Sequence, residues 1–134
     1  MLADELHKSG KMDNATPPPR LRIRIVFGAA EMMGPGKAEL LERIASTGSI
    51  AAAGREMGMS YKRAWELIGT LNAMFQAPLV TSTRGGPGGG GAVLTDMGHE
   101  VLRLYRDFEV QSARAGAEQL AAFCALLSEH GGKS

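Results

Sequence analysis

The fold is decided by the stretch from Ser49 to Phe75, which reads SIAAAGREMGMSYKRAWELIGTLNAMF. Ser49 has the chemistry of an N-cap, and the apolar residues after it predict a short helix that ends at Gly58. Ser60 caps a second helix, whose apolar residues recur at intervals of three and four up to Phe75. Two helices joined by a short turn that contains glycine have the geometry of a helix-turn-helix.

Upstream of this stretch the sequence predicts one more helix and a strand. Leu40, Leu41 and Ile44 fall at helical spacing between the breaker Gly34-Pro35-Gly36 and a stop at Gly48. The run from Arg20 to Phe27 alternates basic and apolar residues, which is typical of a strand with one buried face. Its arginine row either touches phosphate or, as we favour, forms a solvated edge that discourages aggregation.

Downstream, two short apolar runs enclose a glycine-rich segment. Residues 79–84 and 92–94 predict strands, and Gly85 to Gly91 form the tip of the hairpin between them. A hairpin directly after the second helix of a helix-turn-helix is the winged arrangement. Thr95 then opens a long amphipathic helix whose apolar positions include Leu102, Tyr105, Phe108, Ala113, Ala117, Leu120, Cys124 and Leu127.

The fold class that follows is mostly α with a small β wing, a winged helix-turn-helix with a long C-terminal dimerisation helix. A chain of 134 residues suits one domain, since the usual size is roughly 100–200 residues. We assign residues 1–19 to a disordered leader that ends in prolines and 20–95 to the winged helix-turn-helix. Residues 96–130 form the dimerisation helix, and residues 131–134 form a tail.

Charge is divided unevenly along the chain although the net charge is only +1. Residues 20–90 carry nine basic and five acidic side chains, whereas both flanking segments are weakly acidic. A basic middle suits a polyanion as partner. No apolar run reaches the ~20 residues of a membrane helix, and no secretory signal opens the chain, so we expect a cytoplasmic protein without membrane contact. The single Cys124 reads as a small buried hydrophobe in preference to a reactive thiol.

The first turn of the second helix carries the residues that point to function. Tyr61, Lys62 and Arg63 face outward if Ala64 faces inward, so this polar end is able to enter a major groove. Lys62 and Arg63 are candidates for base-edge or phosphate contacts, and the alternative is a solvated cationic face. Trp65 lies beside the buried stripe, where its ring either completes the core or flanks DNA; we favour partial burial.

Catalytic readings find little support. The glycine tract lacks the Lys-Ser/Thr and the following helix of a phosphate-binding loop, and its G-x-G-x-x-G match has no strand-to-helix context. The residues His7, His99 and His130 lie far apart and without zinc-ligand spacing. We therefore predict no enzyme, no catalytic residue and no metal site.

From Gly34 to about Tyr105 the sequence resembles the DNA-binding domain of the ModE-type molybdate-responsive regulators, a winged-helix family related to the LysR-type helix-turn-helix. Three blocks carry the resemblance: Ala45 to Ile50, Met59 to Trp65 with its Ser-Tyr-Lys-x-Ala-Trp order, and the glycine-rich wing from Gly85 to Thr95.

The resemblance implies a regulator, which we take to be a repressor, that binds double-stranded DNA as a homodimer. Helix 60–75 would lie in the major groove, and the wing 84–92 would lie on the backbone or minor groove. The residues expected to face DNA are Ser49, Ser60, Tyr61, Lys62, Arg63, Trp65, Arg84, Gly85, Gly86, Gly88, Gly89 and Gly90. Those expected to form the dimer are Leu102, Tyr105, Phe108, Leu120 and Leu127.

Two departures from the family pattern matter. Pro87 stands where the wing often carries lysine, which removes one expected phosphate contact. The oxyanion-binding module of larger members has no counterpart up to Ser134, so we expect no cofactor, and a second regulator is a candidate source of molybdate sensing.

Two alternatives stay open at this point. The winged fold is also suited to a protein-interaction module that has lost DNA binding and pairs with another regulator through its last helix. That helix spans more than 25 residues of apolar pattern, which a small three-helix core cannot cover. It either dimerises or folds back after Gly116.

Overall fold

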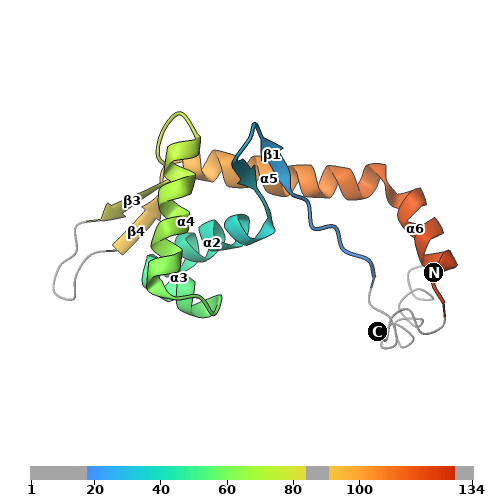
Figure 1. Ribbon diagram of the computed structural model, residues 1–134, viewed down its shortest axis with the longest axis horizontal. Coiled ribbons are helices and arrows are strands. Elements are labelled where there is room, and N and C mark those ends of the chain that lie inside the picture. Colours follow the sequence, from blue (N-terminus) through green and yellow to red (C-terminus); the bar gives the residue numbers. More distant parts are fainter. Residues whose placement is uncertain (1–17, 84–90, 129–134) are drawn as a thin grey trace, which may run out of the picture. The chain divides into compact units, whose positions relative to one another are not determined.

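The structure, a computed structural model, describes residues 18–83 and 91–128. Residues 22–110 form one compact unit, and the described residues outside this range belong to a second unit. Helices predominate, as the sequence predicts, and the strands form two small antiparallel pairs. The elements, labelled as in Figure 1, are β1 (Ile25–Phe27), β2 (Glu31–Met33), α2 (Pro35–Thr47), α3 (Ile50–Glu56), α4 (Tyr61–Met74), β3 (Val80–Thr83), β4 (Gly91–Leu94), α5 (Asp96–Ala115) and α6 (Ala117–Leu126).

The three helices α2, α3 and α4 pack in sequence, with α2 on α3 and α3 on α4 (Figure 1). Both serine caps are confirmed: Ser49 Oγ accepts from the amide of Ala52 at 3.0 Å, and Ser60 Oγ accepts from that of Arg63 at 3.0 Å. Gly48 ends α2 in the left-handed conformation at φ 73°, which a glycine adopts without strain. Helix α4 ends at Met74, a few residues before the predicted stop near Pro78.

The close crossing of α3 and α4 depends on small residues. A Cβ built on Gly54 would lie 3.1 Å from the Cβ of Ala64 and 3.4 Å from Cγ of Met59. Ala53 and Ala64 are themselves fully buried. A larger side chain at position 54 would therefore push α4 away from α3.

The predicted hairpin after α4 is present as an antiparallel pair of strands. Val80 pairs with Leu94 at one end, and Thr83 pairs with Gly91 at the other. Strand β4 also packs on α2, so the hairpin is fixed to the helical domain (Figure 1). The connecting residues 84–90 lie outside the described part of the chain.

The N-terminal strand is shorter than predicted, and it has a partner that the sequence pattern did not predict. Only residues 25–27 form β1, which pairs with β2 across a turn containing Gly28 at φ 68°. The predicted alternation nevertheless extends upstream: Ile23 is half-buried, and Arg22 and Arg24 are exposed. A two-stranded ribbon of three-residue strands leaves few positions from which period two can be recognised.

Helix α5 closes the core of the 22–110 unit. Thr95 Oγ1 accepts from the amide of Gly98 at 3.0 Å and donates to the Pro78 carbonyl at 2.7 Å. A Cβ at Gly98 would overlap the carbonyl oxygen of Leu79, so only glycine permits this approach of α5 to β3. Aliphatic side chains fill the centre, and the largest fully buried ones are Leu40, Leu41, Ile44, Ile68, Leu71 and Leu79.

Tyr105 requires a correction, because it belongs to this core and not to an exposed dimer surface. Its side chain is 3% exposed, and its hydroxyl donates to the carbonyl of Ile23. The apolar stripe of a helix that packs within its own chain and the stripe of one that dimerises follow the same spacing, so the sequence did not separate them.

The single helix predicted over 96–130 is two helices. Gly116, at φ −100° and ψ 15°, interrupts the helical conformation between α5 and α6, and α6 ends at Leu126. No residue of α6 is buried, and Cys124 is exposed, which corrects the expectation of a buried thiol. Across residues 18–83 and 91–128, no helix has the length and apolar character needed to cross a membrane.

Candidate nucleic-acid interface

The first turn of α4 presents three polar or aromatic side chains to solvent. Tyr61, Lys62 and Arg63 are all exposed, as predicted, because Ala64 turns into the core. Successive residues of an α-helix are rotated by about 100°, which places Lys62 on the outward side together with Glu66. Helix N-termini carry a partial positive charge, and Lys62 and Arg63 add to it. This turn therefore suits a negatively charged partner.

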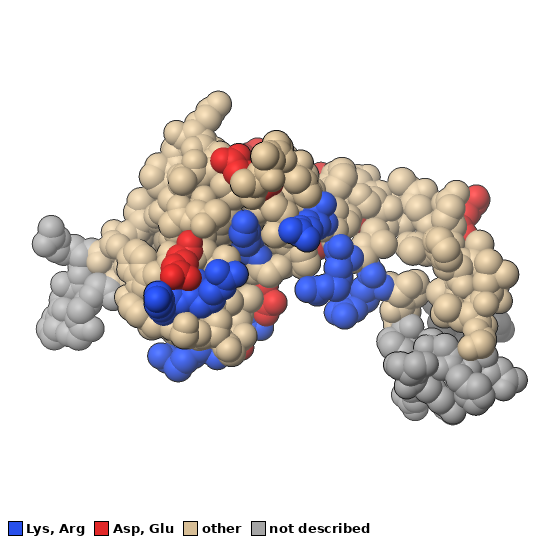
Figure 2. All heavy atoms as spheres, viewed as in Figure 1, with Lys and Arg blue, Asp and Glu red and all other residues tan. Residues whose placement is uncertain are grey.

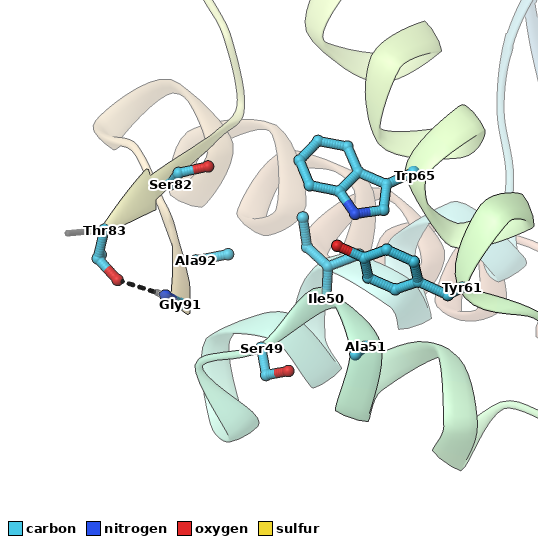
Figure 3. Close-up of a pocket in the computed structure, with 9 residues that line it drawn as sticks. All are labelled: Ser49, Ile50, Ala51, Tyr61, Trp65, Ser82, Thr83, Gly91 and Ala92. Carbon is cyan, nitrogen blue, oxygen red and sulfur yellow. Dashed lines mark hydrogen bonds between the residues drawn. The ribbon is translucent and has the colours of Figure 1, made fainter. Parts of the chain in front are cut away.

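A hollow of about 260 Å³ lies beside this turn, between the start of α3, the first half of α4 and the hairpin. In Figure 3, Tyr61 and Trp65 extend from α4 toward it, and strands β3 and β4 form the other side. The rings of Tyr61 and Trp65 meet edge to face, with centroids 6.0 Å apart. The full lining is Ser49, Ile50, Ala51, Tyr61, Trp65, Ser82, Thr83, Gly91 and Ala92.

The two aromatic rings remain accessible. Tyr61 is 56% exposed and Trp65 is 42% exposed, so the indole is more exposed than the partial burial that we favoured from the sequence. Hydroxyls of Ser82 and Thr83 lie across the hollow from these rings (Figure 3). Apolar ring faces together with hydroxyl groups suit a ligand that combines apolar and polar edges, as a nucleotide does.

The hairpin is fixed beside the helices by hydrogen bonds from the backbone and from one side chain. The amide of Ala92 donates to the Gly48 carbonyl at 2.9 Å. Asn72 Oδ1 accepts from the amides of Leu79 at 2.8 Å and Val80 at 3.1 Å, and its Nδ2 donates to the Val80 carbonyl. Asn72 thus ties α4 to the first strand of the hairpin. The sequence did not single it out, since an asparagine near a helix end has many roles.

The predicted DNA-facing residues divide into three groups. Tyr61, Trp65 and Ser49 line one hollow, although the Ser49 hydroxyl is also the cap of α3. Lys62 and Arg63 are exposed on the first turn of α4, and Ser60 is exposed while capping that helix. The wing residues lie outside the described part of the chain; they are Arg84, Gly85, Gly86, Gly88, Gly89 and Gly90.

The residues predicted to dimerise differ in how exposed their side chains are. Phe108 is 49% exposed and Leu127 is exposed, whereas Leu102 is partly buried against the core and Leu120 is partly buried. The pattern missed Leu104, which is exposed one turn before Phe108. Both line an apolar groove of about 280 Å³ with Ile25, Phe27, Met33, Phe75, Val101 and Tyr105.

Residues 18–83 and 91–128 contain no candidate metal site. No group of three or more His, Cys, Asp or Glu side chains is placed there to hold an ion. Of the three histidines in the sequence, His99 lies in the described part of the chain, and its side chain is exposed.

Comparison with known proteins agrees with this geometry. Residues 36–99 match the family described as bacterial regulatory helix-turn-helix protein, lysR family. They span α2, α3, α4, the hairpin and the start of α5. Residues 36–99 are a LysR-type helix-turn-helix domain. Proteins of this family are regulatory and not enzymes, as the sequence predicts.

Individual relatives show which members of the LysR-type family this domain resembles. MopB of Rhodobacter capsulatus, a molybdenum-pterin-binding protein, is 45% identical over 82 residues, which are 61% of this chain and 30% of MopB. ModE of Escherichia coli K12, a DNA-binding transcriptional dual regulator, is 44% identical over 71 residues, or 53% and 27% of the two chains. ModE of Azotobacter vinelandii, a molybdenum transport protein, is 43% identical over 72 residues, or 54% and 27%. The domain is ModE-like, and the chain spans less than a third of the length of these relatives.

Proposed function

We propose that this chain is a sequence-specific DNA-binding regulator that inserts α4 into the major groove. One observation carries the proposal: the first turn of α4 is exposed and cationic, and it lies beside the aromatic hollow, which is the hollow that Tyr61 and Trp65 line next to the hairpin. A major groove about 12 Å wide admits an α-helix of about 10–12 Å diameter. Lys62 then faces base edges, and Tyr61 and Trp65 face the sugar-phosphate wall on the hairpin side.

The wing, residues 84–92, is proposed to contact the backbone or the minor groove next to α4. The support is the placement of its two ends, because Thr83 and Gly91 both line the aromatic hollow. Thr83 Oγ1 accepts from the Gly91 amide at 3.0 Å, which closes the hairpin at this point.

The genes that we propose as targets are linked to molybdate, and repression is the proposed direction of control. The support is the names of the relatives, which refer to molybdenum binding, molybdenum transport and transcriptional regulation. A transcriptional reporter driven by a selected operator tests the direction: expression falls when the chain is supplied if it represses, and rises if it activates.

We propose that the functional unit is a homodimer formed through α5 and α6. Leu104 and Phe108 are both exposed beside the apolar groove, and α6 has no buried residue although most of its side chains are apolar. Exposed apolar surface of this kind is typical of an interface.

A fluorescence anisotropy titration on duplex DNA at several salt concentrations separates this function from the protein-interaction module. A DNA binder that neutralises several phosphates loses affinity steeply, by about 0.9 log units in K per phosphate for each log unit of salt. Binding that is absent, or that shows no slope, contradicts the proposal and favours the interaction module.

Molybdate itself is expected to bind this chain weakly or not at all. An oxyanion held tightly needs several donors in an enclosed site, whereas the cationic side chains Arg22, Arg24 and Arg63 are exposed. Calorimetry with molybdate tests this expectation, and a micromolar dissociation constant would refute it.

A further inference from the structure

We propose that a second hollow, on the side of α4 opposite the hairpin, binds phosphates of the DNA backbone. This inference rests on the proposed function and assigns Arg63, Arg24, Arg22 and Lys37 to phosphate contacts. Arg63 then stops being a candidate base reader, and Lys62 alone of the two cations in the first turn faces the bases.

The hollow has a volume of about 610 Å³ and draws cations from three parts of the chain. Arg22 and Arg24 precede β1, Lys37 lies in the first turn of α2, and Arg63 lies in the first turn of α4. The floor is apolar and adaptable, because Met32, Met57, Met59 and Leu67 also line it. In Figure 2, Lys and Arg side chains gather on the face that carries α3 and the start of α4 and continue toward β1.

Among the described residues, few acidic side chains compensate the positive charge of this hollow. Among ion pairs of the described residues, its cations take part in one, between Arg63 and Glu66 at 4.0 Å. Burial lowers the pKa of Lys37, and the nearby charges of Arg24 and Arg63 lower it further. Lys37 Nζ donates one hydrogen bond to the Met32 carbonyl at 2.7 Å, which leaves two of its three protons for a ligand. Cations of like charge that line one hollow favour an anionic partner.

The position of the hollow around α4 identifies that partner. At about 100° per residue, Tyr61 and Trp65 lie on one flank of the helix, and Arg63, Leu67 and Thr70 lie on the opposite flank. The outward side, with Lys62, is between them. A helix in the major groove has one phosphate backbone on each side. The aromatic hollow faces one backbone, and the cationic hollow faces the other.

The width and exposure of the hollow favour a polymer over a small free anion. Its three arginines are exposed, and they reach it from different segments, so their charges are spread along a surface. A sugar-phosphate chain offers successive phosphates for such spread cations, and the apolar faces of deoxyribose match the methionine floor. A free tetrahedral anion contacts only the few donors that converge on one point.

The test uses the full chain with Arg24→Gln, Arg63→Gln and the double variant, titrated by anisotropy against a selected operator and a random duplex. Each single variant is expected to lose affinity for the operator and for the random duplex by the same factor. The slope of log K against log salt is negative and is expected to become less steep by about 0.9 for each phosphate that is no longer neutralised. The double variant is expected to lose more affinity than either single variant. Arg103→Gln removes an equally exposed arginine from α5 that does not line the hollow, so its slope stays that of the wild type. Thermal melting confirms that the variants fold.

The outcomes separate this inference from the proposed function. A wild-type chain that binds no DNA overturns both. A wild-type chain that binds with a steep slope, together with a double variant of unchanged affinity and slope, overturns the inference alone. A loss by Arg63→Gln that is confined to the operator makes Arg63 a base reader and overturns its assignment to phosphate. Micromolar binding of inorganic phosphate or molybdate by calorimetry, abolished in the double variant, makes the hollow a small-anion site and also overturns the inference.

Discussion

Lys62 is the residue that we expect to carry sequence discrimination. It lies on the outward side of α4, between the two flanks that we propose to face the DNA backbones. Its ammonium group donates hydrogen bonds, and guanine presents acceptors in the major groove. Lys62→Ala is expected to weaken operator binding by about 1–3 kcal/mol and random DNA by less, as measured by anisotropy on both duplexes. Equal losses on the two duplexes would make Lys62 another phosphate contact.

Asn72 has a structural role that its chemistry makes testable. Asn72→Ala leaves the amides of Leu79 and Val80 without their side-chain acceptor, at positions that are buried. We expect it to lower the free energy of unfolding by about 1–3 kcal/mol in urea denaturation. Thr70→Ala is the matched control, because the exposed Thr70 hydroxyl donates to the Glu66 carbonyl of its own helix. An Asn72→Ala variant as stable as this control would show that the hairpin does not need the tie.

At the scale of elements, two helical glycines give opposite predictions. Gly98→Ala forces a Cβ against the backbone of Leu79 and is expected to destabilise the fold by about 1–3 kcal/mol. Gly69→Ala in α4 meets nothing within 4 Å and is expected to stabilise it by about 0.5–1 kcal/mol. Thermal melting of both variants tests the packing of α5 on β3, and shifts of the same sign would contradict it.

The sequence predicted those elements whose boundaries have local chemical signals. Ser49 and Ser60 cap α3 and α4, and Gly48 ends α2, because each of these residues satisfies backbone groups within its own turn. The two hairpin strands were found between Pro78 and the cap at Thr95. The exposed turn of Tyr61, Lys62 and Arg63 followed from the phase of the buried stripe.

Other features depend on contacts between distant segments, which leave no local pattern. The pairing of β2 with β1, the tie from Asn72 to β3 and the place of Tyr105 in the core are of this kind. The cationic hollow is also of this kind: the arginine row was recognised, but its convergence with Lys37 and Arg63 was not.

At the scale of the whole molecule, dimerisation and DNA binding are expected to fail together. Two half-sites read by one symmetric dimer bind far more tightly than one half-site does. Phe108→Asp or Leu120→Asp puts a charge on an apolar helix face and is expected to shift the chain toward monomer in analytical ultracentrifugation and to weaken operator binding. Arg103→Asp also adds an acidic side chain to an exposed site of α5 and is expected to leave the dimer intact. A dimer that survives both Phe108→Asp and Leu120→Asp would contradict this assignment.

The most direct test of the central claim is selection of genomic fragments on the purified chain at near-physiological salt, with and without molybdate, followed by sequencing. We predict enrichment of an inverted repeat near genes for molybdate transport or molybdoenzymes, because a symmetric dimer of this LysR-type domain requires two matched half-sites. We also predict equal enrichment with and without molybdate. Absence of any enriched sequence would contradict the assignment of α4 as a recognition helix and favour the interaction module.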